Sequence, residues 1–193
     1  MRCYTHDFIL ILICIFSDQV KNPPLRKCVI VSDSMAKYVE LLQTKVQSFP
    51  GINISRLSYK ISKGLVDLSA ELVILHVGTN DISGCLTEKE IKASYNDLIS
   101  AVRKRSSARV LVSAIIPRPI DFDATGERVK NVNKELADLC VTRRAKFLRT
   151  FKPFLKRGEP RREYFAIRDG GLHLNNEGIR RLTEFFINTI AHL

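Results

Sequence analysis

The sequence predicts an α/β protein of three layers (α/β/α), in which helices cover both faces of a five-stranded, mainly parallel sheet. Short apolar runs rich in β-branched residues alternate along the chain with longer segments whose apolar residues recur at helical spacing. The run Leu72–Val77 is mostly apolar and stops at Gly78, as expected of a central strand buried on both faces. Repeated alternation of strand and helix is typical of a sheet whose strands run parallel.

The first half of the domain is expected to hold three strands and two helices. Met35, Val39 and Leu42 lie at helical spacing directly after the polar turn that closes the first strand. A turn at Pro50-Gly51 precedes a loosely alternating segment, which favours a second strand. The expected order is strand Lys27–Val31, helix Met35–Gln47, strand Ile52–Tyr59, short helix Leu65–Ala70 and strand Leu72–Val77.

The second half continues the alternation of helices and strands. Thr87 and Glu90 fit a capping box, and the helix that they open ends in three cations at Arg103–Arg105, which complement the helix dipole. The elements expected after it are strand Val110–Ile116, helix Glu127–Arg144, strand Lys146–Thr150, an irregular basic and aromatic loop over Phe151–Ile167, and a final helix from Asn176 to Ala191.

Length and charge limit the possible organisation. The chain has 193 residues, of which 45% are hydrophobic, and this is enough for one well-buried domain, expected over residues 25–193. The net charge of +11 is uneven, since residues 101–193 carry 20 basic and 10 acidic side chains. A basic face attracts nucleic acid, anionic lipid or acidic partners without specifying which, and a solvated surface explains it equally well.

The cysteines and the N-terminal segment bear on the compartment. Five cysteines without CxxC spacing indicate neither a disulfide framework nor a zinc site, so a reducing, cytoplasmic location is expected. Residues 1–24 are expected to form a hydrophobic extension and linker. The apolar stretch Phe8–Phe16 is too short for a transmembrane helix but matches the core of a signal peptide over residues 1–17. An additional strand, a hydrophobic tail or an appended piece are the alternatives, and Asn22-Pro23-Pro24 then forms the linker.

Candidate catalytic residues follow the predicted strands. Ser34 follows the first strand, Gly64 the second, Asn80 the third and His173 the fifth. In a doubly wound sheet these residues would lie at one edge, where ligands bind. Ser34 is either a helix N-cap or a nucleophile. As a nucleophile it would use His173 as its base and Asp169 to orient that base. The N–H groups of Ser34 and Gly64 and the Asn80 amide would then form the oxyanion hole.

From Lys27 to Leu193 the sequence resembles the SGNH or GDSL-type esterases and lipases. The usual Gly-Asp-Ser block stands here as Ser32-Asp33-Ser34, and Gly-x-Asn-Asp is intact from Gly78 to Asp81. The block around His173 continues in Leu174-Asn175 as the family pattern does, and the second-block glycine maps to Gly64. The likeness is strongest to SGNH-like domains of transposon-encoded proteins of invertebrates and fish, and it extends more distantly to the RNA-binding domain of Oskar. It implies a flavodoxin-like strand order.

The resemblance implies a serine esterase that needs no metal and no organic cofactor. A small ester is the expected substrate, with a short acyl group such as acetyl transferred through an acyl-Ser34 intermediate. Two positions depart from the pattern, because Ser32 replaces a glycine and three residues rather than two separate Asp169 from His173. If the carboxylate misses the imidazole, a Ser34–His173 dyad backed by a backbone carbonyl is the alternative.

The alternative function is an inactive or weakly active module that binds RNA or another polyanion through its basic second half. Aromatic residues between the cations could stack on bases, or they could pack the loop onto the core. The cations of this tract are Arg143, Arg144, Lys146, Arg149, Lys152, Lys156, Arg157, Arg161 and Arg162, and the interleaved rings are Phe151, Phe154, Tyr164 and Phe165.

Overall fold

The computed structural model of the chain describes residues 26–193. The predictions for the signal peptide, the N-terminal strand or tail, the linker and the domain boundary at Leu25 lie outside the described residues. Within 26–193, no helix is long and apolar enough to cross a membrane.

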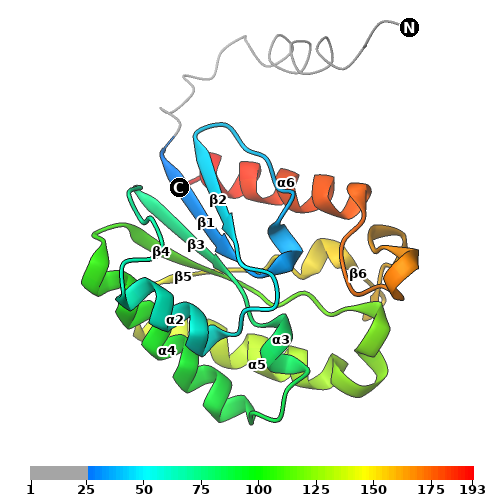
Figure 1. The fold of residues 1–193 in the computed structure, drawn as a ribbon. Coiled ribbons are helices and arrows are strands. Elements are labelled where there is room, and N and C mark those ends of the chain that lie inside the picture. The colour runs from blue at the N-terminus through cyan, green and yellow to red at the C-terminus, as the bar shows by residue number, and fades with distance from the viewer. Residues whose placement is uncertain (1–25) are drawn as a thin grey trace, which may run out of the picture.

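Five parallel strands form one sheet within the described part of the chain, in the order β2-β1-β3-β4-β5 (Figure 1). This confirms the predicted fold class and strand order. The strands pair in a register that brings the ends of β1 and β3 level, since Ser32 lies opposite His76. The strands are β1 (Cys28–Ser32), β2 (Thr44–Ser48), β3 (Leu72–His76), β4 (Arg109–Ser113) and β5 (Lys146–Leu148).

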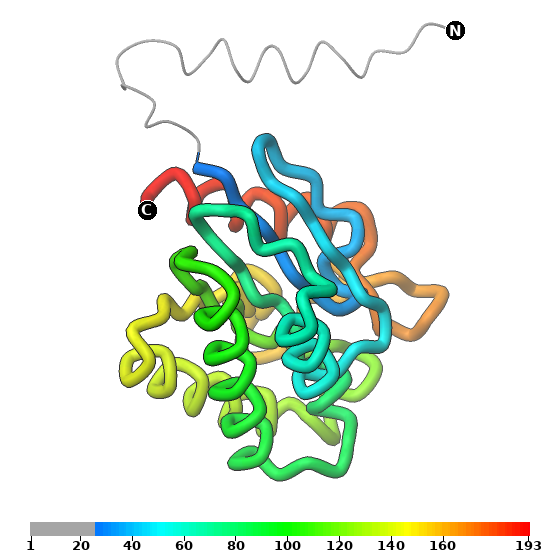
Figure 2. The backbone as a smooth tube through the Cα atoms, turned by 60° about the vertical axis from the view of Figure 1, so that its left-hand side comes forward, coloured from blue at the N-terminus to red at the C-terminus, as the bar shows by residue number. Residues whose placement is uncertain are grey.

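The two faces of the sheet are covered differently. Helices α2 (Ile54–Ser62), α4 (Glu88–Arg105) and α5 (Phe122–Thr142) lie against one face, and α6 (Asn176–Ala191) lies against the other (Figures 1 and 2). Side chains alternate between these cores along each strand. In β3, Val73 and Leu75 face the three helices, whereas Leu72 and Ile74 face α6. The sheet is therefore buried on both sides, which explains the uninterrupted apolar runs.

Three predicted elements in the first half are wrong. Residues Met35–Gln47 do not form a helix, because a short 3-10 turn (η1, Ser34–Ala36) leads into a loop and then into β2. The predicted strand Ile52–Tyr59 is instead helix α2, capped by Asn53, whose side chain accepts the backbone N–H of Arg56. The segment Leu65–Ala70 forms no helix.

The second half agrees closely with the predicted elements. The capping box at Thr87 and Glu90 is present at the start of α4, and α6 spans the predicted residues. Helix α5 begins five residues earlier than predicted, at Phe122. A small hairpin of β6 (Leu155–Lys156) and β7 (Glu159–Pro160) lies within the irregular basic loop.

Candidate active site

The turn after β1 is built around Asp33. Its Oδ1 accepts the backbone N–H of Met35 at 3.0 Å, so Asp33 caps the 3-10 turn. Its Oδ2 accepts the hydroxyl of Thr79 at 2.7 Å, which ties this turn to the one after β3. Ser34 is therefore not the cap, and its half-buried hydroxyl is left for another partner.

That partner is His173. The Ser34 Oγ lies 3.1 Å from His173 Nε2, and His173 Nδ1 lies 2.8 Å from Asp169 Oδ2. Serine and histidine are 139 positions apart in sequence, and they meet because one follows β1 and the other precedes α6. The three side chains thus form a continuous hydrogen-bonded relay with the geometry of a nucleophile, a base and an orienting acid.

Two glycines allow the loop between Asp169 and His173 to accommodate its additional residue. Gly170 and Gly171 adopt φ of +69° and +90°, a backbone region that suits glycine. The resulting tight loop lets Asp169 Oδ1 accept the N–H groups of Gly171 at 3.2 Å and of Leu172 at 2.9 Å. The other carboxylate oxygen remains directed at the imidazole.

Two opposing effects act on the pKa of Asp169. Desolvation alone would raise it, but the hydrogen bonds from the His173 ring and from the backbone N–H groups of Leu172 and His173 outweigh burial. The net pKa of Asp169 is therefore below its usual value, and the carboxylate is charged at neutral pH.

The turn after β3 brings a side-chain amide to the same edge. Gly78 takes φ of +123°, and a Cβ there would lie 2.7 Å from the Ile115 side chain, so the sharp turn requires glycine. Asn80 Nδ2 donates to the carbonyl of Ile52 at 2.9 Å. An amide nitrogen carries two hydrogens, so a second donor remains.

The structure places Gly64 away from this site, which makes its predicted role in the oxyanion hole wrong. Gly64 follows the C-terminus of α2, its N–H donates to Ile61, and a Cβ there would meet the Arg105 side chain. Helix α2 has returned the chain to the opposite edge of the sheet. The prediction failed because the segment after Pro50 was assigned as a strand, which moved the expected strand end too far along the chain.

Gly51 is the glycine that follows β2 at the catalytic edge, and the sequence reasoning missed it. It adopts φ of +72° and precedes Ile52, whose carbonyl binds Asn80. No hydrogen bond from the Gly51 N–H occurs among the described residues. The Pro50-Gly51 pair was the available signal, because this pair marks a turn.

Two arginines hold the loops after β3 and β4. Arg118, which is buried, pairs with Asp121 and also bonds the Ser83 hydroxyl. Arg128 on α5 donates to the carbonyls of Ile82, Gly84 and Leu86. These contacts fix the loops over Ser83–Leu86 and Pro117–Thr125 that flank the catalytic edge.

His76 is packed in the core and is not part of the relay. It is 3% exposed, and its Nδ1 lies 2.6 Å from the hydroxyl of Ser113. Desolvation lowers the pKa of His76, partly opposed by the nearby charge of Asp33, so the ring is neutral. Ser113 in turn bonds Thr150, which donates to the Ala114 carbonyl, so the buried polar groups satisfy one another.

The described residues contain no group of three or more His, Cys, Asp or Glu side chains arranged to hold a metal ion. Three of the four aromatic residues in the basic tract are buried: Phe154, Tyr164 and Phe165 pack edge to face. These rings pack the loop onto the core, so base stacking on them is not supported.

Comparison with known structures agrees with this fold. Among solved structures, a GDSL-like lipase from Bacteroides thetaiotaomicron superposes with a TM-score of 0.74 at 12% identity, covering 97% of this chain and 98% of the other. A member of the lipolytic protein G-D-S-L family from Veillonella parvula gives 0.72 at 16% identity, covering 86% and 98%. A lipase/acylhydrolase from Enterococcus faecalis gives 0.67 at 15%, covering 86% and 96%.

These structural likenesses concern the fold. No curated protein matches the sequence. The model of the GDSL-like Lipase/Acylhydrolase family, however, matches residues 30–181. That span holds the turn after β1, the turn after β3 and the loop with His173, and the chain belongs to the GDSL-like lipase/acylhydrolase family.

Proposed function

We propose that the protein is a serine ester hydrolase whose nucleophile is Ser34. The observation that carries the proposal is the unbroken relay from Ser34 Oγ through the His173 ring to Asp169. In the first step Ser34 Oγ attacks the ester carbonyl carbon and its proton passes to His173 Nε2. The tetrahedral intermediate then expels the alcohol, which takes that proton. Asp169 stabilises the imidazolium.

The second half of the reaction regenerates the enzyme. A water molecule attacks the acyl-Ser34 ester and gives its proton to His173 Nε2, and the collapse of this intermediate returns the proton to Ser34 and releases the acid. No group beyond the chain and water is needed.

The donors for the oxyanion are the backbone N–H of Ser34, the free amide hydrogen of Asn80 and the backbone N–H of Gly51. All three belong to turns at the carboxyl edge of the sheet, after β1, β3 and β2. Donors that are fixed before reaction stabilise the developing charge without reorganisation. The proposal therefore replaces Gly64 by Gly51 in this role.

The proposed substrates are small esters with a short acyl group such as acetyl. In support, the large apolar cavity beside α5 has none of Ser34, Asp169 and His173 in its lining. A series of p-nitrophenyl esters from acetate to decanoate tests the preference, and kcat/KM that rises with chain length contradicts it.

Labelling with a fluorophosphonate probe tests the nucleophile. The wild-type chain should be labelled, and Ser34→Ala and His173→Ala should abolish labelling while the far-ultraviolet circular dichroism stays unchanged. Ser62→Ala removes an exposed serine on α2 and is the matched control, which should label as the wild type does. A folded wild-type protein that takes no label contradicts the proposal.

RNA binding stays a prediction that rests on charge. The finer likeness to transposon-encoded domains and to Oskar also stays a prediction, and it rests on the motifs around Asn80 and His173. Exposed cations such as Arg144, Lys146 and Lys152 follow α5 and β5, and binding through them would weaken steeply as salt increases. An RNA affinity that is absent or indifferent to salt removes this alternative.

A further inference from the structure

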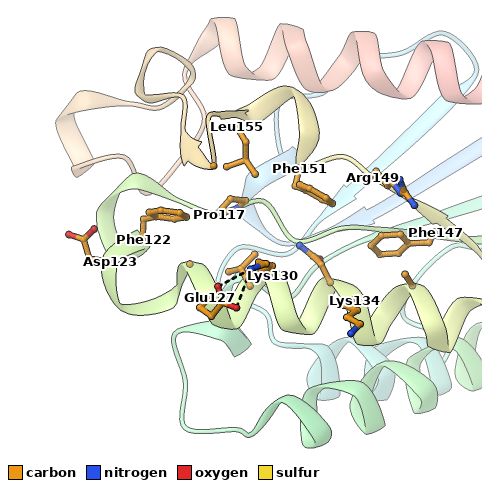
Figure 3. A pocket seen from close by; sticks show the side chains of 15 residues that line it. Pro117, Phe122, Asp123, Glu127, Lys130, Lys134, Phe147, Arg149, Phe151 and Leu155 are labelled. Carbon is orange, nitrogen blue, oxygen red and sulfur yellow. Dashed lines mark hydrogen bonds and ion pairs between the residues drawn. The ribbon is translucent and has the colours of Figure 1, made fainter.

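A groove with a volume of about 850 Å³ lies between α5 and the segment that follows β5 (Figure 3). It is bounded at one end by Pro117 and Phe122 and at the other by Phe147 and Arg149. This volume falls in the range of pockets that bind small molecules, roughly 300–1,000 Å³. None of the residues of the proposed catalytic relay lines it.

The walls of the groove are mainly apolar and aromatic. Phe151 and Leu155 approach α5 from the segment after β5, and the half-buried ring of Phe147 extends the same wall. On α5, the Phe122 ring lies across Gly126, where a Cβ would come within 2.6 Å of it. A glycine inside a helix is less favourable than alanine, and here it makes room for the aromatic wall.

The charges of the lining are separated along the groove. Glu127 and Lys130 pair with each other at 3.2 Å and cancel. Asp123 lies at the end near Phe122 and Arg149 at the end near Phe147, whereas Lys134 lies on α5, on the side of Phe147 away from Arg149 (Figure 3). Neither Lys134 nor Arg149 forms a salt bridge with any described residue. The end of the apolar groove near Phe147 therefore carries the guanidinium of Arg149, which has no salt bridge among the described residues, and Lys134 adds positive charge on the α5 side.

We propose that this groove binds a single-chain fatty carboxylate, with the aliphatic chain along the aromatic wall and the carboxylate at Arg149. Apolar surface removed from water drives the chain into the groove. Arg149 offers a planar pair of N–H donors that matches a carboxylate, and Lys134 adds a second positive charge. A cationic amphiphile of the same length would meet repulsion at this end. None of Ser34, Asp169 and His173 lines this groove, so the site is distinct from the proposed catalytic relay.

The experiment is isothermal titration of the full chain with sodium dodecanoate below its micelle concentration, and with dodecyltrimethylammonium as a probe of equal length and opposite charge. Dodecanoate should bind with one equivalent, and the ammonium compound at least about tenfold more weakly, because it cannot form the charge-assisted contact with Arg149. Equal affinity for the two probes overturns the proposal.

Two variants locate the site. Ala137→Trp fills the groove from α5 and should abolish dodecanoate binding. The double variant Arg149→Gln/Lys134→Gln should weaken it at least about tenfold. Its matched control is Arg56→Gln/Lys63→Gln, which removes two exposed cations from α2 and its C-terminus. The control therefore has the same net charge as the groove double variant. This control should bind as the wild type does.

The same variants separate the groove from other sites. If dodecanoate binds both groove variants with unchanged affinity, it occupies another site, for example the region beside Ser34. The proposal is then wrong. The double variant changes only exposed side chains and stays informative if Ala137→Trp fails to fold. An equal loss in the α2 control assigns the effect to net charge and also overturns the proposal.

Discussion

The two carboxylate oxygens of Asp169 have different hydrogen-bond partners and different roles. Oδ2 faces the His173 ring, and Oδ1 gathers the backbone N–H groups of the loop that leads to that ring. The carboxylate thus shapes the loop and fixes the imidazole tautomer together. Because the hydrogen bond from the His173 ring and those from the backbone N–H groups together lower its pKa despite desolvation, Asp169 remains an acceptor throughout the expected working range of pH.

Asp169→Asn should lower kcat by about 10³–10⁴-fold, since an amide can hold the imidazole in the wrong tautomer. The rate of p-nitrophenyl acetate hydrolysis measures the effect. Asp138→Asn changes an exposed acid on α5 in the same way and should leave kcat unchanged. A loss of less than about tenfold at Asp169 would instead favour the dyad backed by a backbone carbonyl.

Gly171→Ala isolates the role of the loop. Gly171 and Gly158 both have φ of +90°, so alanine is strained at either position by about 1–3 kcal/mol. A Cβ at Gly171 would also lie 2.7 Å from the Pro119 side chain, whereas a Cβ at Gly158 meets nothing within 4 Å. We expect Gly171→Ala to lower kcat/KM at least tenfold beyond Gly158→Ala, because the clash displaces the His173 loop. Equal activities of the two variants would contradict this.

Asn80→Ala should lower kcat by about 10²–10³-fold through the loss of one oxyanion donor. Gly64→Ala should leave kcat unchanged, because Gly64 lies at the far edge of the sheet and its nearest neighbour is the flexible end of Arg105. Steady-state kinetics of the two variants test whether Asn80, and not Gly64, contributes a donor to the proposed oxyanion hole. Impaired catalysis by Gly64→Ala in a fully folded protein would restore the original assignment.

At the scale of elements, the segment between β1 and β3 shows where sequence patterns mislead. Met35 and Val39 are buried as a helical face requires, but Leu42 is 75% exposed, so the apparent helical spacing ends after one turn. The edge strand β2 (Thr44–Ser48) mixes polar residues with one valine and carries no apolar run that would announce it. Pairing with β1, and not local preference, makes it a strand.

Helix α2 could have been found from its cap. Asn53 is a favoured N-cap residue, and Ile54, Leu57 and Ile61 lie on the buried face of a helix. The same residues, together with Ile52, also alternate loosely enough to resemble a strand. Helices α4 and α6 were predictable because each is long and carries its cap next to a clear apolar period.

Asp81 links two of these elements and should make stability depend on pH. It is 3% exposed in α3 (Thr79–Ile82), accepts the N–H of Ile54 at the start of α2, and burial raises its pKa to about 6. An unfolded aspartate titrates near pH 4. Between about pH 4 and pH 6 the folded chain therefore holds a proton that the unfolded chain has lost, so the free energy of unfolding falls as pH rises.

Asp81→Asn should remove this dependence. The unfolding free energy of the variant minus that of the wild type should increase by about 2–3 kcal/mol from pH 4 to pH 6. Urea denaturation across this interval measures it, with Asp138→Asn as a control whose curve should stay parallel to that of the wild type. A parallel curve for Asp81→Asn would mean that its carboxyl titrates normally in the folded protein.

For the whole molecule, the strand-helix alternation and the parallel sheet together explain what could be predicted. Once β1 and β3 are parallel, Ser34 and Asn80 must leave the sheet at the same edge, and this follows from strand direction without knowledge of side-chain packing. Other features depend on backbone angles and contacts that the sequence permits but does not determine. These are the position of Gly51 after β2, the capping of the first turn by Asp33 in place of Ser34, and the hydrogen bond between Asp169 and His173.

The unequal cover of the two sheet faces leads to the last prediction. Among the described elements, α6 is the one long helix on its face, and its Phe186 is fully buried with its ring edge to face against His76 at 5.9 Å. Phe186→Ala should lower the free energy of unfolding by about 3–5 kcal/mol, since no second helix can close the cavity. The neighbouring Ile187 is 50% exposed, so Ile187→Ala should cost about 0.5 kcal/mol or less. Urea denaturation compares them, and similar costs for the two would show that α6 is not seated on the sheet through Phe186.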